Sequence, residues 1–135
     1  MKSSDTGENL GNVLLMLTTT NRSSRQPMVS AVQYEDFEGE HCVILPRRTR
    51  VGWYMNILAS PWVDAQVKGK KYHALAEPVT DNTRIADFFQ NCLSNRSPKV
   101  VDLVKTHGLP SRSSRGQLEA LASTQLVIFL HKAME

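Results

Sequence analysis

The sequence predicts a mainly β protein, a small β-barrel to which α-helices are added. Six short segments are rich in β-branched residues or alternate apolar and polar side chains, which is typical of strands. The last of them follows a helical stretch, and a strand that returns in this way can cover an open sheet edge. The chain has 135 residues, enough for one domain. We therefore expect a flexible lead-in over residues 1–12 and a single barrel domain over residues 13–135.

The strands are expected where the period-two pattern is clearest. Pro46 ends the third of them, because proline cannot donate a hydrogen bond to a central ladder. The acidic segment Glu35–Glu40 contains Gly39 and is interpreted as a hairpin loop. Gly69–Lys70 is expected to form a tight turn between the fourth and fifth strands. The six expected strands are Val13–Thr19, Met28–Tyr34, His41–Leu45, Trp62–Lys68, Lys71–Val79 and Thr124–His131.

Helices are expected where apolar residues recur at helical spacing. Pro61 stops the first helix, Thr80 with Asp81 offers an N-cap for the second, and Gly108 follows the third as its C′ residue. The expected helices are Val51–Ser60, Thr80 to about Leu93, Pro98–Thr106 and Gln117–Ala122.

Composition excludes several classes of protein. The net charge is +3 and the sequence pI is about 9.0, which is only mildly basic. Apolar runs such as Leu126–Leu130 fall far below the roughly 20 residues that cross a bilayer, so we expect no integral membrane segment. Met1–Gly11 lacks the apolar region of a signal peptide. Cys42 and Cys92 lack CxxC spacing, which favours buried, reduced thiols in a cytoplasmic protein.

Several kinds of chemistry also lack support. The four histidines have no metal-ligand spacing, and we expect no metal site. The phosphate-binding P-loop, the dinucleotide GxGxxG motif and the hydrolase GxSxG motif are absent from the sequence. Aromatic residues are not interleaved with the basic clusters as in single-strand nucleic-acid binders, so no nucleic-acid partner is expected. A weak association with a membrane surface and a homodimer stay open.

Two basic segments could hold an anion. Leu17–Arg25 is a strand that ends in three threonines and enters a loop with two arginines, and Leu45–Arg50 carries three arginines in four residues. Hydroxyls, backbone N–H groups and guanidinium forks together suit phosphate oxygens. Each segment could equally be a solvated turn. In Trp53–Val63 two tryptophans and a tyrosine could cap a flat ring system or pack in the core.

Taken together, these segments resemble a known family. Val13–Ser24, VLLMLTTTNRSS, resembles an opening strand followed by TTTGRxSG. Trp53–Val63, WYMNILASPWV, resembles the pattern WYxNLxAxPxV, and Val67–Tyr72 matches the strand–turn–strand that comes next. The family is that of the deazaflavin-dependent nitroreductases, and the resemblance covers residues 13–79 well. It implies the split β-barrel fold shared with FMN-binding oxidases. Asn21 and Arg25 stand where that pattern has glycines.

The resemblance implies an oxidoreductase that transfers a hydride from reduced coenzyme F420, a deazaflavin, to an electron-poor small molecule such as a quinone or nitro compound. FMN is the second choice of cofactor. We expect Tyr54 to be the proton donor or an orienting hydroxyl, because no other phenol lies in the motif; the alternative is that Tyr54 only packs. A carrier or sensor that binds a flavin without turnover is the alternative. The expected cofactor-binding residues are Thr20, Asn21, Arg22, Ser23, Ser24, Arg25, Pro46, Arg47, Arg48, Arg50, Trp53, Tyr54 and Asn56.

Overall fold

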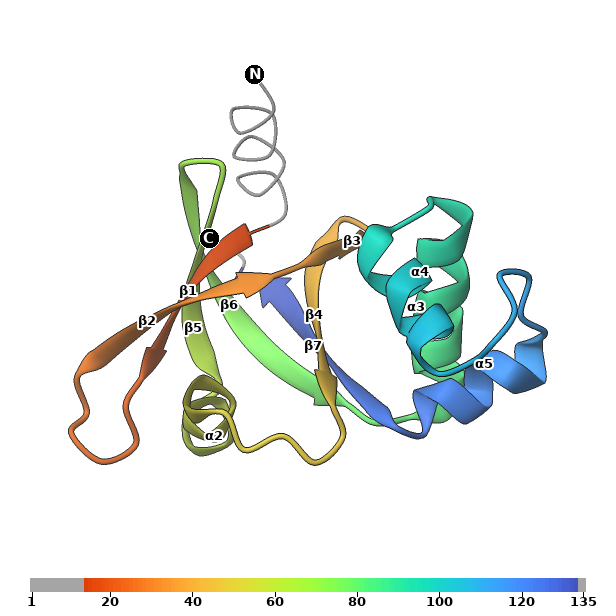
Figure 1. Cartoon of the computed structure of the whole chain (residues 1–135). Helices are drawn as coiled ribbons and strands as arrows, with labels where there is room; N and C mark the ends of the chain where they lie inside the picture. Colours follow the sequence, from red (N-terminus) through yellow and green to blue (C-terminus); the bar gives the residue numbers. More distant parts are fainter. Residues whose placement is uncertain (1–13, 134–135) are drawn as a thin grey trace, which may run out of the picture.

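The computed structural model describes residues 14–133, and it confirms a mainly β fold, with α3, α4 and α5 on one side of the sheet and α2 at one end of the barrel (Figure 1). The expected lead-in over residues 1–12 and the start of the first strand at Val13 lie outside the described residues. The strands are β1 (Leu14–Thr20), β2 (Pro27–Gln33), β3 (Glu35–Phe37), β4 (Glu40–Pro46), β5 (Trp62–Val67), β6 (Lys70–Val79) and β7 (Gln125–Lys132). The helices are α2 (Gly52–Ala59), α3 (Asn82–Ser94), α4 (Pro98–Thr106) and α5 (Arg115–Ala122).

All the strands belong to one antiparallel sheet that curls into a half-barrel. Its order is β2-β1-β5-β6-β7-β4-β3, so the closing strand β7 lies between β6 and β4. The pairing of β4 with β3 covers only Glu40, His41 and Cys42. Beyond Cys42 that edge of β4 has no strand partner among the described residues, and neither has the outer edge of β2. The two edges face each other and leave a seam in the barrel wall.

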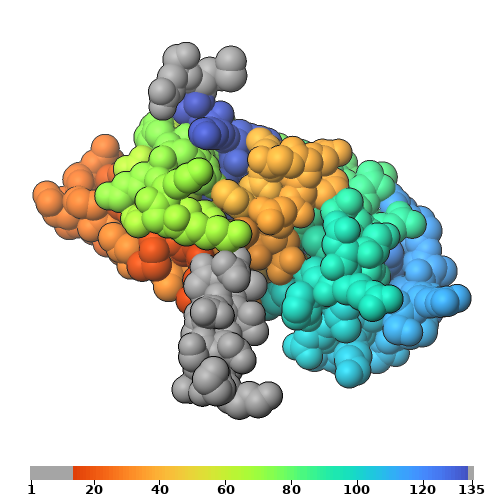
Figure 2. All heavy atoms as spheres, turned by 90° about the horizontal axis from the view of Figure 1, so that it is seen from above, coloured from red at the N-terminus to blue at the C-terminus, as the bar shows by residue number. Residues whose placement is uncertain are grey.

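Two hydrophobic cores lie on opposite faces of β4 and β7. Inside the barrel Leu126, Ile128 and Leu130 pack with residues of β1, β5 and helix α2. On the outer face Val127 and Phe129 pack against α3, α4 and α5, the helices that cover one side in Figure 2. All six positions from Gln125 to Leu130 are therefore buried, as expected of a strand with cores on both faces.

All the predicted strands and helices are present, with ends that differ by one or two residues at most, and one strand was missed. Glu35–Phe37 is a strand and not part of the hairpin loop, because two residues are enough to reverse the chain after it. Glu38 and Gly39 both have positive φ, 52° and 80°, the conformation of a tight two-residue hairpin turn. Lys68 and Gly69 repeat it with φ of 52° and 80°, one residue earlier than the predicted Gly69–Lys70 turn.

The helical region follows the predicted capping. Asp81 accepts hydrogen bonds from the backbone N–H groups of Thr83 and Arg84 at 2.9 and 3.2 Å, so Asp81 and not Thr80 is the N-cap of α3. Helix α4 has the predicted bounds, and Gly108 follows it with a φ of +72°. Helix α5 starts two residues before the prediction, because Ser114 and Gln117 form a capping box.

Candidate functional site

The loop between β1 and β2 is built around the side chain of Asn21. Its Oδ1 accepts hydrogen bonds from the backbone N–H groups of Ser23 and Ser24, both at 2.9 Å, which is a local turn typical of asparagine. Ser23 and Ser24 are exposed, whereas Thr20 is half-buried at the end of β1. Arg25 has a φ of +66°, so the backbone there has the conformation that glycine adopts most easily. The glycine of the family pattern at this position thus has a physical reason.

Asn56 attaches this loop to helix α2. The side chain of Asn56 is fully buried, and its Oδ1 accepts from the backbone N–H of Arg22 at 3.1 Å and from the guanidinium Nη1 of Arg22 at 2.8 Å. Its Nδ2 donates to the Thr19 hydroxyl at 3.1 Å and lies 3.4 Å from the sulfur of Met28. Both the oxygen and the nitrogen of the Asn56 amide are thus bonded to protein groups, and the side chain positions the β1–β2 loop.

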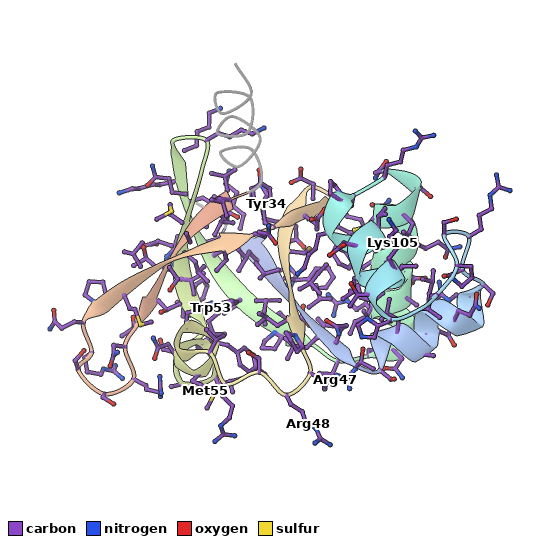
Figure 3. The ribbon with its side chains drawn as sticks, viewed as in Figure 1. Tyr34, Arg47, Arg48, Trp53, Met55 and Lys105 are labelled. Carbon is purple, nitrogen blue, oxygen red and sulfur yellow. The ribbon has the colours of Figure 1, made fainter. Side chains whose placement is uncertain are left out.

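The loop between β4 and α2 contains two different kinds of arginine. The guanidinium of Arg47 donates to the carbonyl oxygens of Gln125 at 2.7 Å, Ala122 at 2.8 Å and Thr80 at 3.2 Å. Arg47 thus ties the end of β4 to the segments that flank β7 and α3. Arg48 is exposed and points away from the fold in Figure 3, and Arg50 is exposed as well. Pro46, the last residue of β4, pairs with Gln125.

Helix α2 closes the end of the barrel where the two basic loops lie (Figure 1). Trp53 is buried and belongs to the inner core, against which Tyr54 is packed as a half-buried side chain. Gly52 at the start of the helix lies close to Met28, since a Cβ at Gly52 would lie 3.3 Å from the terminal methyl group of Met28. The helix is thus held against the start of β2 and between the loops that carry Arg22 and Arg48.

The seam between β2 and β4 contains a groove with a volume of about 200 Å³. A second hollow of about 410 Å³ adjoins it and shares Gln33, Glu35 and Lys99 in its lining. The hollow is within the range of about 300–1,000 Å³ that is ordinary for small-molecule sites, and the groove is smaller. The walls of the groove are mainly apolar, and its polar residues gather toward the adjoining hollow. The lining residues of the groove are Val32, Gln33, Glu35, Val43, Ile44, Leu45, Trp53 and Lys99.

The groove has the chemistry that a flat, polar-edged ring requires. Aliphatic side chains and the Trp53 indole can cover its faces. Backbone N–H and C=O groups along the unpaired edges of β2 and β4 can bond to its polar rim, as they would to a strand. Trp53 is the one predicted cofactor-binding residue that lines this groove, and Tyr54 beside it does not. Thr20 and Arg25 line a different hollow.

Sequence reasoning missed Glu35 and Lys99. The carboxylate of Glu35 accepts a hydrogen bond from the Ser97 hydroxyl at 2.6 Å. Burial is the main cause that raises the pKa of Glu35, and the nearby Asp36 raises it further, whereas the bond from Ser97 acts in the opposite direction. Lys99 comes from α4, more than sixty residues later in the sequence and has no motif around it. Only the fold brings the two together, because it places the start of α4, with its N-cap Ser97, beside Glu35.

In the described part of the chain, no cluster of three or more histidine, cysteine, aspartate or glutamate side chains could hold a metal ion. Among the same residues, no helix is both long and apolar enough to span a bilayer.

Comparison with known proteins places this architecture in a family. The model of the family described as F420H2-dependent quinone reductase matches residues 2–108, well over half of the chain. The chain belongs to the F420H2-dependent quinone reductase family. The matched segment contains both basic loops, helix α2 and both strands of the seam. The family description names reduced coenzyme F420, and the expected deazaflavin cofactor is thereby confirmed. A search of curated proteins gave no match.

Solved structures support the fold of this F420H2-dependent quinone reductase family member. An F420 reductase is similar with a TM-score of 0.52 and 19% identity over 94% of this chain and 93% of its own. A conserved hypothetical protein of Mycobacterium tuberculosis gives 0.58 and 13% over 99% and 82%. The heme storage protein HutZ of Vibrio cholerae gives 0.54 and 12% over 97% and 90%. At these identities the likeness shows the fold alone, and the predicted split β-barrel is confirmed.

Proposed function

We propose that this protein binds reduced coenzyme F420 with the deazaflavin ring in the groove between β2 and β4 and reduces an electron-poor organic molecule such as a quinone. The main support for this site is the groove itself, which is apolar, lies between two unpaired strand edges and has the Trp53 indole in its wall. Family membership supports the reductase activity. When bound, reduced F420 supplies a hydride; the substrate gains that hydride and one proton.

The anionic tail of the cofactor is assigned to the basic end of the barrel. Arg22 and Arg48 lie on the two loops that flank α2, and Arg48 and Arg50 are exposed. No side chain caps the N-terminus of α2, so N–H groups of its first turn are open to an anion. Arg47 has a different role, because its guanidinium is bonded to backbone carbonyls of the protein. The serines and Arg25 complete the loop beside Arg22.

The proton of the reaction needs a donor near the groove. Glu35 lines the groove, and its raised pKa increases the fraction of neutral carboxyl groups that can donate. Tyr54 has a phenol one residue from Trp53 and is the alternative donor. Its packing against the inner core favours a positioning role. The open hollow beside Glu35 and Lys99 is where a flat substrate is proposed to approach.

Binding tests the cofactor assignment directly. F420 is titrated into the wild type, Arg22→Ala, Arg48→Ala and the control Arg112→Ala, which is exposed in the loop before α5. Each of the first two variants should lose about 1–3 kcal/mol of binding free energy, the size of a charge-assisted contact, and the control should match the wild type. Equal affinity in all four proteins would remove the anion site from these loops. FMN is titrated in parallel and is expected to bind more weakly.

Turnover tests the reaction and the proton donor. The reduced cofactor is mixed with a panel of quinones and nitro compounds, using the wild type, Glu35→Gln and Tyr54→Phe. Glutamine can still accept the bond from Ser97 but cannot donate a proton of similar acidity. We therefore expect Glu35→Gln to lower kcat and flatten its pH profile, with a smaller effect of Tyr54→Phe. The reverse order would assign the proton to Tyr54. Tight binding without turnover would instead support a carrier or sensor.

A further inference from the structure

A separate cavity opens at the end of the barrel opposite the basic loops. It has a volume of about 350 Å³ and lies between the β3–β4 hairpin, the β5–β6 hairpin and the end of β7. Figure 2 shows these three segments side by side, in orange, green and blue. Its lining shares no residue with the groove between β2 and β4. Nothing in the proposed reductase chemistry uses it.

The wall of this cavity carries a hydrogen-bonded pair of side chains. Nδ1 of His41 lies 2.6 Å from the hydroxyl of Tyr72, and Nε2 of His41 lies 3.5 Å from a carboxylate oxygen of Asp36. Burial is the main cause that lowers the pKa of His41, which favours the neutral ring. In the neutral ring the phenol of Tyr72 can donate to Nδ1, and this arrangement places the imidazole proton on Nε2, toward Asp36.

The acidic side chains around the cavity have histidine neighbours, whereas the lysines form no ion pairs within the described residues. Of its two acids, Glu40 is bonded to His131 at 2.7 Å, whereas Asp36 lies 3.5 Å from the His41 ring, whose neutral form is favoured. In residues 14–133, Lys68, Lys70 and Lys132 form no ion pair. All three lysines line the cavity, and the amine of Lys132 lies 5.8 Å from the centre of the Tyr72 ring. Positive charge at the rim is therefore free for a ligand.

The cavity also offers an apolar surface for a ring. The rings of Tyr34 and His41 meet edge to face, with their centres 4.8 Å apart, and Val67 and Leu130 add aliphatic wall. Aromatic and aliphatic walls with a few polar groups are typical of sites for small organic molecules. Lysine amines above such walls favour a ligand that is flat and apolar at one end and anionic at the other.

We propose that this cavity is a second small-molecule site, which binds an aromatic carboxylate or a similar flat organic anion. The ring lies against Tyr72 and Leu130, and the carboxylate meets Lys70 and Lys132. The site is independent of the F420 groove, so it holds whether or not the reductase proposal does.

Benzoate is the probe that tests the site. It is titrated into the full-length protein at low ionic strength, because salt screens contacts with exposed lysines. NMR resonances of the His41 ring and of the Trp53 indole are followed together. We expect a Kd below about 1 mM, with shifts at His41 and none at Trp53. Acetate should bind more weakly, since it lacks the ring, and benzylamine should not bind, since its charge is reversed.

Matched lysine variants decide where the carboxylate sits. Lys70→Ala and Lys132→Ala should each raise the Kd of benzoate about two- to fivefold, as expected for an exposed ion pair. Lys105→Ala makes the same change in net charge on α4, away from the cavity, and should leave the Kd unchanged. The proposal is overturned if all three variants behave alike, if acetate binds as well as benzoate, or if the shifts appear at Trp53 in place of His41.

Discussion

Replacing Asn56 by alanine is expected to lower the free energy of unfolding by about 2–4 kcal/mol. The change deletes two hydrogen bonds to Arg22 and the donor to Thr19. Arg22 is exposed and can regain water, so its loss is small. Thr19 is only 1% exposed, and a buried polar group without its partner costs about 1–3 kcal/mol. The cavity left by the amide adds to this cost.

Urea denaturation followed by tryptophan fluorescence measures the effect. With a slope of about 1–3 kcal/mol per M, the midpoint should fall by about 1–2 M at an unchanged slope. Asn91→Ala is the matched control, because Asn91 is exposed on α3 and surface substitutions usually stay within about 0.5 kcal/mol. If Asn56→Ala and Asn91→Ala have the same midpoint, the amide of Asn56 does not hold the β1–β2 loop against α2, and the reasoning is refuted.

Three further outcomes are expected. Arg47→Ala should destabilise the fold by about 2 kcal/mol, because several backbone carbonyls lose a charged donor, whereas Arg48→Ala should leave urea midpoints unchanged; equal effects would contradict the division of roles. Hydrogen bonds that the protonated ring of His131 donates, chiefly to Glu77 and also to Glu40, raise its pKa above 6.5. The stabilisation relative to His131→Gln, compared by urea denaturation across pH, should therefore be full below pH 6.5 and vanish as pH rises through that raised pKa; a difference that grows with pH would exclude it. Cys42 and Cys92 are buried and burial raises the pKa of both, so a thiol reagent should label them at the rate of unfolding, and rapid native labelling would count against it.

Local pattern was sufficient for most of the strands and helices. The short apolar run Leu126–Leu130 indicated β7. It is apolar throughout because each face of the strand packs against its own core. The missed strand, Glu35–Phe37, has two acidic residues out of three and lies beside a two-residue turn, so its composition resembles a loop. The segment is nevertheless a strand, because its backbone pairs with β4. Strand formation depends on such neighbours more than on the intrinsic preference of the residues.

The candidate site was harder to predict than the fold. Arg47 and Arg48 are adjacent and chemically identical, yet only Arg47 meets the carbonyls of Gln125 and Ala122. Those acceptors are more than seventy residues away, so no local pattern distinguishes the two arginines. The groove depends in the same way on two strands that fail to pair. The sequence indicates which residues form strands, whereas an unpaired edge is a property of the whole sheet.

The position of β7 in the sheet has a consequence for folding. In the order β2-β1-β5-β6-β7-β4-β3, this strand is the link between β6 and β4, yet it follows all the other strands in the chain. Pairs such as His41 with Leu130 close very long loops, whose entropic cost slows folding. During synthesis the earlier strands can therefore form hairpins. The part of the sheet made of β2, β1, β5 and β6 stays separate from the β4–β3 hairpin until residues 125–132 have been made. The amide hydrogens of β7 should then be among the slowest to exchange once the protein has folded.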